Sequence, residues 1–332
     1  MSQIDEAGVA GPMARYAAGR TGVVAPRSHR ALLRGVGVVA LGASLALGAT
    51  VLAPSAQASP ARLRAAHKPV TIEGAKITVD KALAKKVPTS VKKTGLVDVT
   101  YNDAPPDELV VGSKLVGWEV DLGKAVAATL GVRWHAIASG NFTGFIPGLQ
   151  NGRYNTSFTS FIYTPARVKA IDIVTYYNVG TGFAVVKRSP IHIKTFTDLC
   201  GKSVAVIEGS AFIEQLNGID PTCSKKKLPP VKVATFPSDA AAELAVTSGR
   251  DQVYSSSEDQ LAWLIKKSEH SLVLQPLNYL PTPEGAGVAK SAKIAGLVTK
   301  AMDHLISTGA YKKIMERWGI TYGLVRTAHL YT

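Results

Sequence analysis

Two kinds of hydrophobic spacing alternate along the chain after about residue 95. Short runs rich in β-branched residues, as at residues 96–101 and 203–207, are typical of buried strands. Apolar residues at helical spacing predict helices at residues 119–130, 145–150, 211–216, 240–247, 262–267, 294–305 and 311–318. This alternation predicts an α/β fold with mixed, mostly parallel sheets flanked by helices.

Two further stretches combine strand-like residues with prolines. They lie at residues 185–190 and 281–290. Proline cannot donate to a central strand, so each stretch suits a chain that leaves a sheet. We expect these stretches to connect two lobes.

The first 58 residues have the organisation of a secretory signal peptide. An arginine-rich start is followed by an uncharged run at residues 35–53 and by the small-residue site Ala56-Gln57-Ala58. An uncleaved membrane anchor is the alternative, because this run nearly reaches the length that spans a bilayer. Its glycine and alanine content favours cleavage after Ala58. No cysteine follows the run, so we expect no lipid anchor there.

Residues 59–94 are rich in lysine and alanine and are expected to form a basic tether. The whole chain has a net charge of +14, with 46% hydrophobic and 19% charged residues. That apolar fraction excludes wholesale disorder. The basic runs are not interleaved with aromatic residues, so a surface near an anionic cell envelope is favoured over nucleic-acid binding.

The chain has two cysteines, Cys200 and Cys223. In the oxidising compartment that a signal peptide implies, we expect them to form a disulfide. A cysteine nucleophile is disfavoured, because it needs a free thiolate.

Sequence motifs for catalysis, metals and cofactors are absent. The chain has no G-x-S-x-G, Walker or G-x-G-x-x-G motif, and its seven histidines are scattered without H-E-x-x-H spacing. We therefore expect no metal site and no cofactor.

Arg167 is the residue best placed to bind a ligand. It follows Thr164-Pro165-Ala166, shortly after Thr159 and Ser160 at the end of an apolar segment. An arginine at such a corner suits bidentate capture of a carboxylate. The alternative, which is favoured when Arg167 and its neighbours are considered by themselves, is a surface ion pair with Asp172.

The order of several motifs favours the ligand-binding interpretation. The chain resembles the polar amino-acid-binding proteins of ABC importers, which have the type II periplasmic-binding fold. The resemblance covers roughly residues 90–320 and rests on residues 104–106, 115–122, 142–149, 151–154, 159–161, 164–167, 171–177, 199–206, 208–210 and 309–318.

The resemblance implies two lobes, hinged by two crossover strands, that close on a ligand. The first lobe would comprise residues 95–186 and a return segment at 288–332, and the second would comprise residues 187–287. Arg167 would hold the ligand carboxylate. The other matching positions would donate hydrogen bonds or shape the pocket: Thr159, Ser160, Phe142, Ser210, Ile207 and Ala211.

The sequence departs from the family pattern at the amine end of the ligand. Ser257 stands where an aspartate normally pairs with the α-ammonium group, and Asp103 stands where the family has an aromatic residue. A serine cannot neutralise a dry ammonium group. A shift in alignment could supply Glu258 or Asp259, Asp103 could supply the charge, or the ligand is not a standard α-amino acid.

The resemblance implies a secreted or envelope-associated receptor that delivers an amino acid or related small carboxylate to an ABC permease. It would act as a monomer without nucleic acid. The alternative is an enzyme of the same fold, similar to dehydratases of cyclic carboxylates, with Glu208 or Asp103 as acid or base.

Overall fold

The computed structural model describes residues 69–267 and 271–332. The predicted signal peptide or membrane anchor, and the tether at residues 59–68, lie outside these residues.

One mixed sheet dominates the described chain. It contains nine strands in the order β11-β10-β12-β9-β13-β8-β3-β7, with β14 paired to β9. Their bounds are β3 (Leu96–Tyr101), β7 (Trp134–Ser139), β8 (Thr156–Ile162), β9 (Asp172–Val186), β10 (Ser203–Ile207), β11 (Lys232–Phe236), β12 (Val253–Ser257), β13 (Leu272–Val288) and β14 (Leu324–Tyr331). Strand β3 pairs in parallel with β7 and β8, and β10 pairs in parallel with β11 and β12. The predicted α/β fold is confirmed.

Two small antiparallel sheets accompany the main one. They contain β1 (Val70–Ile72) with β2 (Ala75–Ile77), and β4 (Asp103–Ala104) with β5 (Glu108–Val111) and β6 (Lys114–Val116).

Helices cover the sheet. The α-helices are α2 (Lys81–Lys86), α3 (Thr89–Thr94), α4 (Trp118–Thr129), α5 (Phe145–Gln150), α6 (Pro165–Ala170), α7 (Phe212–Asn217), α8 (Asp220–Lys225), α9 (Asp239–Thr247), α10 (Glu258–Lys267), α11 (Ala295–Ser307) and α12 (Ala310–Arg317). Short 3-10 helices are η2 (Phe142–Gly144), η3 (Phe196–Leu199) and η4 (Lys290–Ala292).

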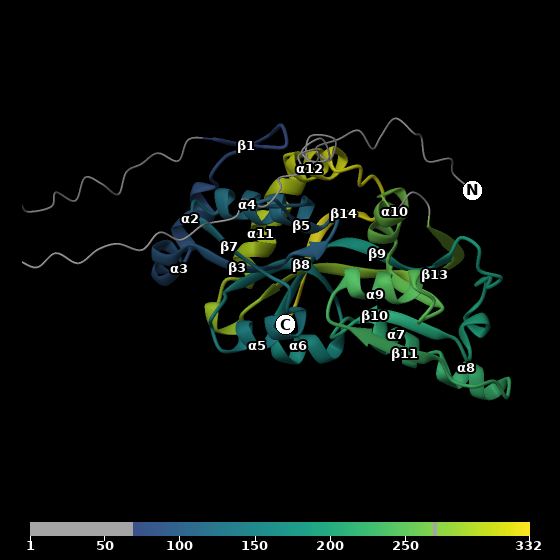
Figure 1. Ribbon diagram of the computed structural model, residues 1–332. Helices are drawn as coiled ribbons and strands as arrows, with labels where there is room; N and C mark the ends of the chain where they lie inside the picture. The colour runs from purple at the N-terminus through teal and green to yellow at the C-terminus, as the bar shows by residue number, and fades with distance from the viewer. Residues whose placement is uncertain (1–68, 268–270) are drawn as a thin grey trace, which may run out of the picture. The chain divides into compact units, whose positions relative to one another are not determined.

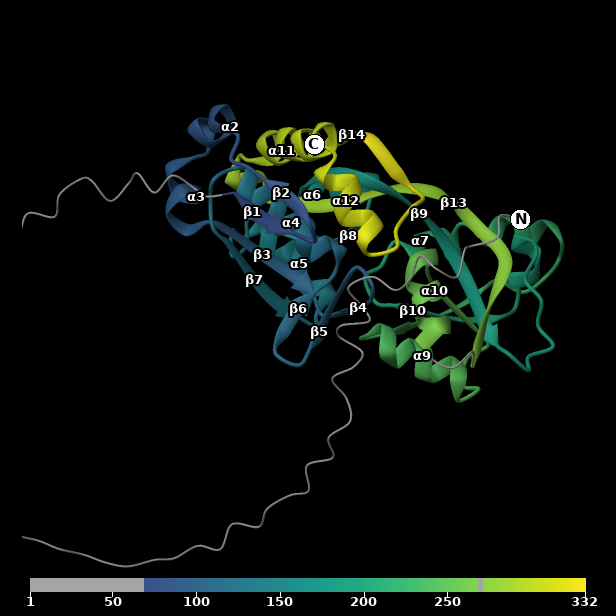
Figure 2. The same ribbon diagram turned by 90° about the horizontal axis from the view of Figure 1, so that it is seen from above.

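The long strands β9 and β13 connect two groups of elements. They run side by side between the group around β3 and β8 and the group around β10 and β12 (Figures 1 and 2). Strand β9 pairs antiparallel with β14 over its first half, whereas Thr181 and Ala184 pair with Ser257 and Tyr254 of β12. The two groups are therefore parts of one continuous sheet. The lobe boundaries themselves remain a prediction.

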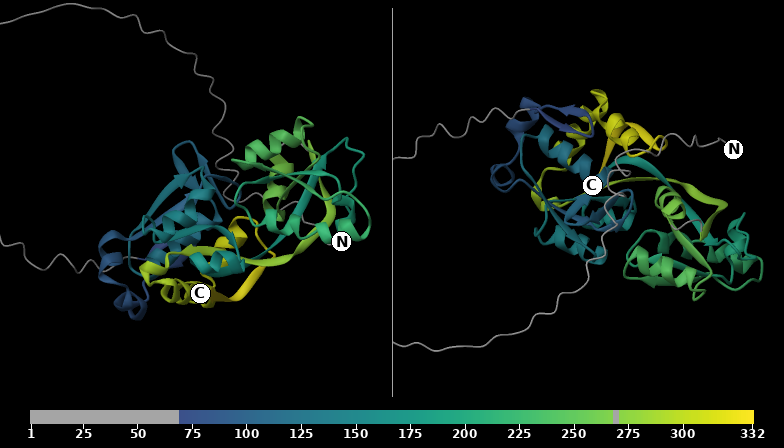
Figure 3. Two further views of the ribbon diagram at one scale, coloured as in Figure 1. Left: turned by 90° about the horizontal axis from the view of Figure 1, so that it is seen from below. Right: turned by 45° about the horizontal axis from the view of Figure 1, so that its top comes forward.

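The first group joins the start and the end of the described chain. Figure 3 shows its blue and yellow segments together, apart from the green segment that contains α7 to α10. Helices α4, α11 and α12 pack on one another, while α5 and α6 lie on the other side of the strands (Figure 1). Trp118, Phe158 and Tyr176 are fully buried between these layers. This packing fixes the end of β8, where Thr159 and Ser160 lie.

Local capping sets the helix starts near the ligand-binding candidates. Thr164 caps α6, since its side chain accepts a hydrogen bond from the Arg167 backbone N–H at 3.2 Å. Helix α10 begins at Glu258, earlier than the predicted start, and its acidic first turn suits the positive end of the helix dipole. Helix α5 has the predicted bounds.

Residues 70–94, within the predicted tether, form elements in the structure. Strand β2 contacts α12, and β1 contacts α4. Helix α2 contacts α11. Ile72, Ile77, Leu83 and Val91 are buried in the main hydrophobic core, because the lysines between them point outward and leave one apolar side. The apolar residues in this segment are few and widely separated, so the sequence shows no periodicity that would predict these helices and strands.

Candidate ligand-binding site

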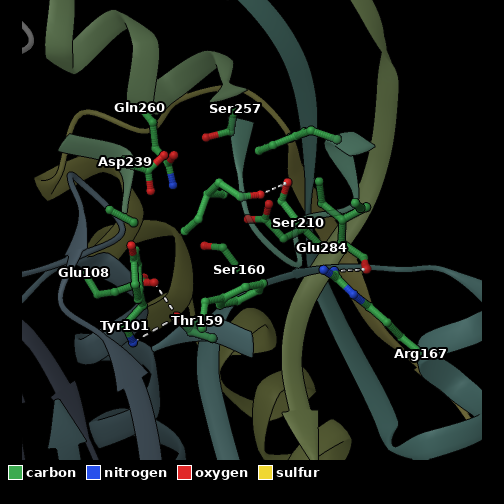
Figure 4. Close-up of a pocket in the computed structure, with 16 residues that line it drawn as sticks. Tyr101, Glu108, Thr159, Ser160, Arg167, Ser210, Asp239, Ser257, Gln260 and Glu284 are labelled. Carbon is green, nitrogen blue, oxygen red and sulfur yellow. Dashed lines mark hydrogen bonds between the residues drawn. The ribbon is translucent and has the colours of Figure 1, made fainter. Parts of the chain in front are cut away.

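One pocket collects most of the residues that the sequence predicts to bind a ligand. Figure 4 shows side chains from β8, β12 and β13 converging on it. Its lining consists of Tyr101, Ala104, Glu108, Phe142, Thr159, Ser160, Ile162, Arg167, Ile207, Ser210, Ala211, Phe212, Asp239, Ser257, Gln260 and Glu284. Eight of the nine predicted ligand-binding residues are therefore brought together, and Asp103 is the exception.

Arg167 lies on α6, with its side chain at one end of the pocket (Figure 4). The residue is 8% exposed. Its Nη1 donates to the Ile162 carbonyl oxygen at 2.8 Å, and its Nη2 donates to the Gly209 carbonyl oxygen at 3.0 Å. Two of five guanidinium donors are used in these bonds, which leaves three for a ligand. Burial lowers the pKa of Arg167 to about 10, so the group stays charged at neutral pH.

The alternative ion pair between Arg167 and Asp172 is not formed. Asp172 instead pairs with Lys290, whose Nζ lies 2.8 Å from its Oδ1. Arg167 thus points into the pocket rather than toward this surface pair.

Ser160 has a backbone conformation that serine rarely adopts. Its φ of 50° lies in the left-handed region. Its N–H donates to Glu119 Oε1 at 3.1 Å, and its hydroxyl donates to Asp107 Oδ2 at 2.9 Å. The next residue back, Thr159, accepts from the Tyr101 N–H at 3.1 Å and donates to Glu108. Such strain, held in place by buried partners, is typical of functional positions.

Apolar side chains form one wall of the pocket. The Phe142 ring packs on Tyr101, with centroids 6.0 Å apart, and on Phe161 at 5.5 Å. The Arg167 guanidinium lies 5.8 Å from the Phe142 centroid. Phe142 is therefore both a wall of the pocket and a support for the guanidinium. Ile207, Ala211 and Phe212 supply the opposing apolar surface.

Ser210 follows the turn that connects β10 to α7. Gly209 has a φ of 76°, which favours glycine, and its carbonyl is the one that binds Arg167. The Ser210 hydroxyl donates to the Ile207 carbonyl oxygen at 2.8 Å. This bond holds the turn, and it leaves the hydroxyl oxygen as an acceptor.

Three carboxyl groups line the pocket, two of them fully buried and one half-buried, and the sequence analysis did not find them. They belong to Glu108, Asp239 and Glu284. Burial raises the pKa of Asp239 to about 7 and holds those of Glu108 and Glu284 well above their ordinary values. Glu108 and Glu284 have no sequence motif around them. Asp239 had a weak signal, since it follows the helix-capping residue Ser238.

The lining of the pocket does not include Asp103, Glu258 or Asp259. Asp103 Oδ2 accepts from the Ala240 N–H at 3.2 Å, beside the pocket. Glu258 Oε1 accepts from Asn278 at 2.9 Å, on an exposed surface. Asp259 is buried but does not line the pocket. The three acids considered for the amine end are therefore placed elsewhere.

A second layer of acids lies behind Ser160. Asp107 Oδ2 also accepts from Gln260 Nε2 at 2.9 Å, which ties β12 and α10 to the β4–β5 segment. Glu119 accepts from the Tyr176 hydroxyl. Burial raises the pKa of Glu119 to about 8 and raises those of Asp107 and Asp259.

Cys200 and Cys223 form a disulfide, as predicted, with an S–S distance of 2.02 Å. It joins the end of η3 to α8. Neither cysteine lines the pocket, so the bridge has a structural role.

Across residues 69–267 and 271–332, no helix is long and apolar enough to cross a membrane. In the same described ranges, no three metal-binding side chains are grouped around a common point.

Comparison with known proteins identifies relatives of this architecture. The family model for bacterial extracellular solute-binding proteins, family 3, matches residues 96–321. The arginine-binding protein ArgT of Corynebacterium glutamicum is 24% identical over 247 residues, which cover 73% of this chain and 80% of ArgT.

Solved structures of amino-acid-binding proteins are also similar to this chain. An ancestral arginine-binding protein bound to arginine is 27% identical with a TM-score of 0.61, over 67% of this chain and 97% of that one. The ancestral amino-acid-binding protein AncCDT-1, a precursor of cyclohexadienyl dehydratase, is 26% identical with a TM-score of 0.57, over 69% of this chain and 97% of that one.

Proposed function

The chain belongs to family 3 of the bacterial extracellular solute-binding proteins, and from this premise we propose that it is the substrate-binding component of an ABC importer. It binds an amino acid, or a related small carboxylate, in the pocket around Arg167. Its partner is an ABC permease, and it works as a secreted or envelope-associated monomer.

The buried Arg167 guanidinium is the observation that carries this proposal. A buried charged group with three remaining donors at the end of a pocket favours a planar anion, and a carboxylate can accept hydrogen bonds from two of these donors in parallel. Ser160 and the turn at Gly209 border the same end of the pocket. Without a bound carboxylate, the positive charge of the buried Arg167 guanidinium would be poorly compensated.

Binding accounts for this pocket better than catalysis. The two acids that the sequence offers for a dehydratase, Glu208 and Asp103, do not line the pocket. AncCDT-1, the neighbour that is related to a dehydratase, is itself an amino-acid-binding protein.

A thermal-unfolding screen of the purified protein against amino acids and small carboxylates tests this function. A ligand that binds only the folded state stabilises it by about 2.7 kcal/mol at a hundredfold excess over Kd. We expect a clear rise of the midpoint with one chemical class and a much smaller rise with the corresponding amides, which lack the carboxylate. No rise with any of these compounds, or an equal rise with the amide, would contradict the proposal.

A further inference from the structure

We propose that the ligand is an amino acid with a cationic side chain, whose α-ammonium is held by Glu284 and whose side-chain cation is held by Glu108. This inference rests on the proposed function and names the class of amino acid that the pocket selects.

The charges of the pocket lining are unbalanced. Glu108, Asp239 and Glu284 contribute carboxyl groups, while Arg167 is the one cation among the described residues of the lining. The α-carboxylate of an amino acid compensates Arg167. A neutral side chain would then leave one ammonium group for three acids, whereas a cationic side chain supplies a second positive charge.

Two of these acids have a buried oxygen atom that lacks a partner. Glu108 Oε2 and Glu284 Oε1 have no hydrogen-bond partner among the residues that the structure describes. Each residue is 1% exposed and lines the pocket. A buried acceptor without a donor is costly, so both oxygens indicate where a donor group of the ligand belongs.

The positions of the two acids distinguish their roles. Figure 4 places Glu284 near the Arg167 end of the pocket and Glu108 at the other end, with Tyr101 and Asp239. Burial lowers the pKa of Arg167, while the Glu214 and Glu284 carboxyl groups raise it. In an amino acid the α-carboxylate and the α-ammonium share one carbon atom. Glu284 is therefore placed for the ammonium group, and Glu108 for the far end of the side chain.

Glu284 accounts for the serine at position 257. The Ser257 hydroxyl is buried in the lining and cannot neutralise an ammonium group. Glu284 lies on β13, where it pairs with Ile162 at the end of β8. A charge from this long strand thus replaces the one that the family pattern places at the end of β12.

The second layer of acids strengthens the preference for cations. Asp107 and Glu119 bind Ser160 from behind the pocket, and both are fully buried. Within the described residues, no lysine or arginine forms an ion pair with either carboxyl group. Burial raises the pKa of both carboxyl groups, and a cation bound in the pocket would favour their ionised forms.

Titration calorimetry of the unmodified protein with matched compounds tests the class of ligand. The pairs are arginine with citrulline and lysine with norleucine, because each pair differs in the side-chain cation. We expect at least one cationic member to bind about 10- to 100-fold more tightly than its neutral counterpart. Removal of the α-amino group, as in 5-guanidinovalerate, should weaken arginine binding by a similar factor.

Two variants test the assignment of the acids. Glu108→Gln should remove most of the preference for the cationic member of the pair, while changing the affinity for the neutral member little. Glu284→Gln should weaken both members equally, because both carry the α-ammonium group. Glu316→Gln, on the exposed face of α12, is the matched control and should change neither affinity.

The outcomes separate this inference from the function on which it rests. A neutral or acidic amino acid that binds as tightly as arginine and lysine would overturn the inference and leave the proposed function intact. Binding of no amino acid and no small carboxylate would overturn both. Unchanged affinity in Glu284→Gln or Glu108→Gln would refute the role of that residue. If a variant fails to fold, the ligand pairs measured on the unmodified protein still test the class of ligand.

Discussion

Arg167 joins the two sides of the pocket, because its Nη2 donates a hydrogen bond of 3.0 Å to the Gly209 carbonyl oxygen. Arg167 follows β8, whereas Gly209 follows β10. The residue that we propose to bind the ligand carboxylate therefore also links the two groups of elements. If Arg167 binds the ligand, the same side chain would take part both in ligand binding and in the contact between the two groups.

Arg167→Lys should abolish binding without unfolding the protein. A lysine ammonium keeps the charge but cannot donate in parallel to a carboxylate while also reaching two carbonyl groups. We expect a loss of affinity of roughly 100-fold or more. Calorimetry measures it, with Arg188→Lys on the exposed surface as control. Unchanged affinity in Arg167→Lys would remove this residue from the site.

Replacement of both cysteines by serine should destabilise the protein and leave binding intact. The bridge closes a loop with a sequence separation of 23 residues. On the chain-entropy model such a loop contributes roughly 3 kcal/mol to the free energy of unfolding. Urea denaturation of the double variant measures this loss. An unchanged denaturation midpoint would show that the bridge does not stabilise the folded state.

The free energy of unfolding of the unliganded protein should fall as the pH rises. Burial raises the pKa of Glu119 from its ordinary 4.5 to about 8. Between these values the unfolded chain releases the proton and the folded protein retains it, so stability falls by at most about 1.4 kcal/mol per pH unit. Asp98 and Asp239, with pKa values raised to about 7, add to this fall.

Denaturation of the wild type and of Glu119→Gln at about pH 5 and about pH 8 checks the sign. The variant should lose less stability than the wild type over this interval. Equal losses would show that Glu119 does not titrate differently in the two states, and a gain in the wild type at high pH would contradict the account.

Deletion of β14 should destabilise the protein without changing its affinity. This strand lies beyond the matched family region, and its Tyr331 ring packs 4.1 Å from that of Tyr163. The Ala328 N–H donates to Asp303 at 2.8 Å. Deletion would expose the edge of β9 and cost about 2 kcal/mol or more. A truncated protein with an unchanged unfolding midpoint would show that β14 adds nothing to stability.

Local patterns predicted the elements whose signal lies within a few residues. The strand at 96–101 and the helix at 145–150 have the predicted bounds, because β-branched runs and helical spacing report burial directly. The elements at residues 70–94 were missed, since Ile72 and Leu83 become buried only where β1 packs on α4 and α2 packs on α11. These elements form because of tertiary contacts rather than because of the local propensity of their sequence.

The same limit applies to the pocket. Thr159, Ser160 and Arg167 are close in sequence, so a motif could identify them. Glu284 comes from a strand more than a hundred residues later, and only the antiparallel pairing of β13 with β8 places it beside them. The left-handed backbone of Ser160 was likewise unpredictable, because it depends on the buried acids that bind it.

The most direct test of the central claim is a titration with the tightest-binding amino acid and with the amine that remains when its carboxylate is removed, such as arginine and agmatine. If Arg167 holds the carboxylate, the amine should bind at least about 100-fold more weakly to the wild type. The difference should largely disappear in Arg167→Ala. Equal affinities of the wild type for the two compounds would contradict the proposed site.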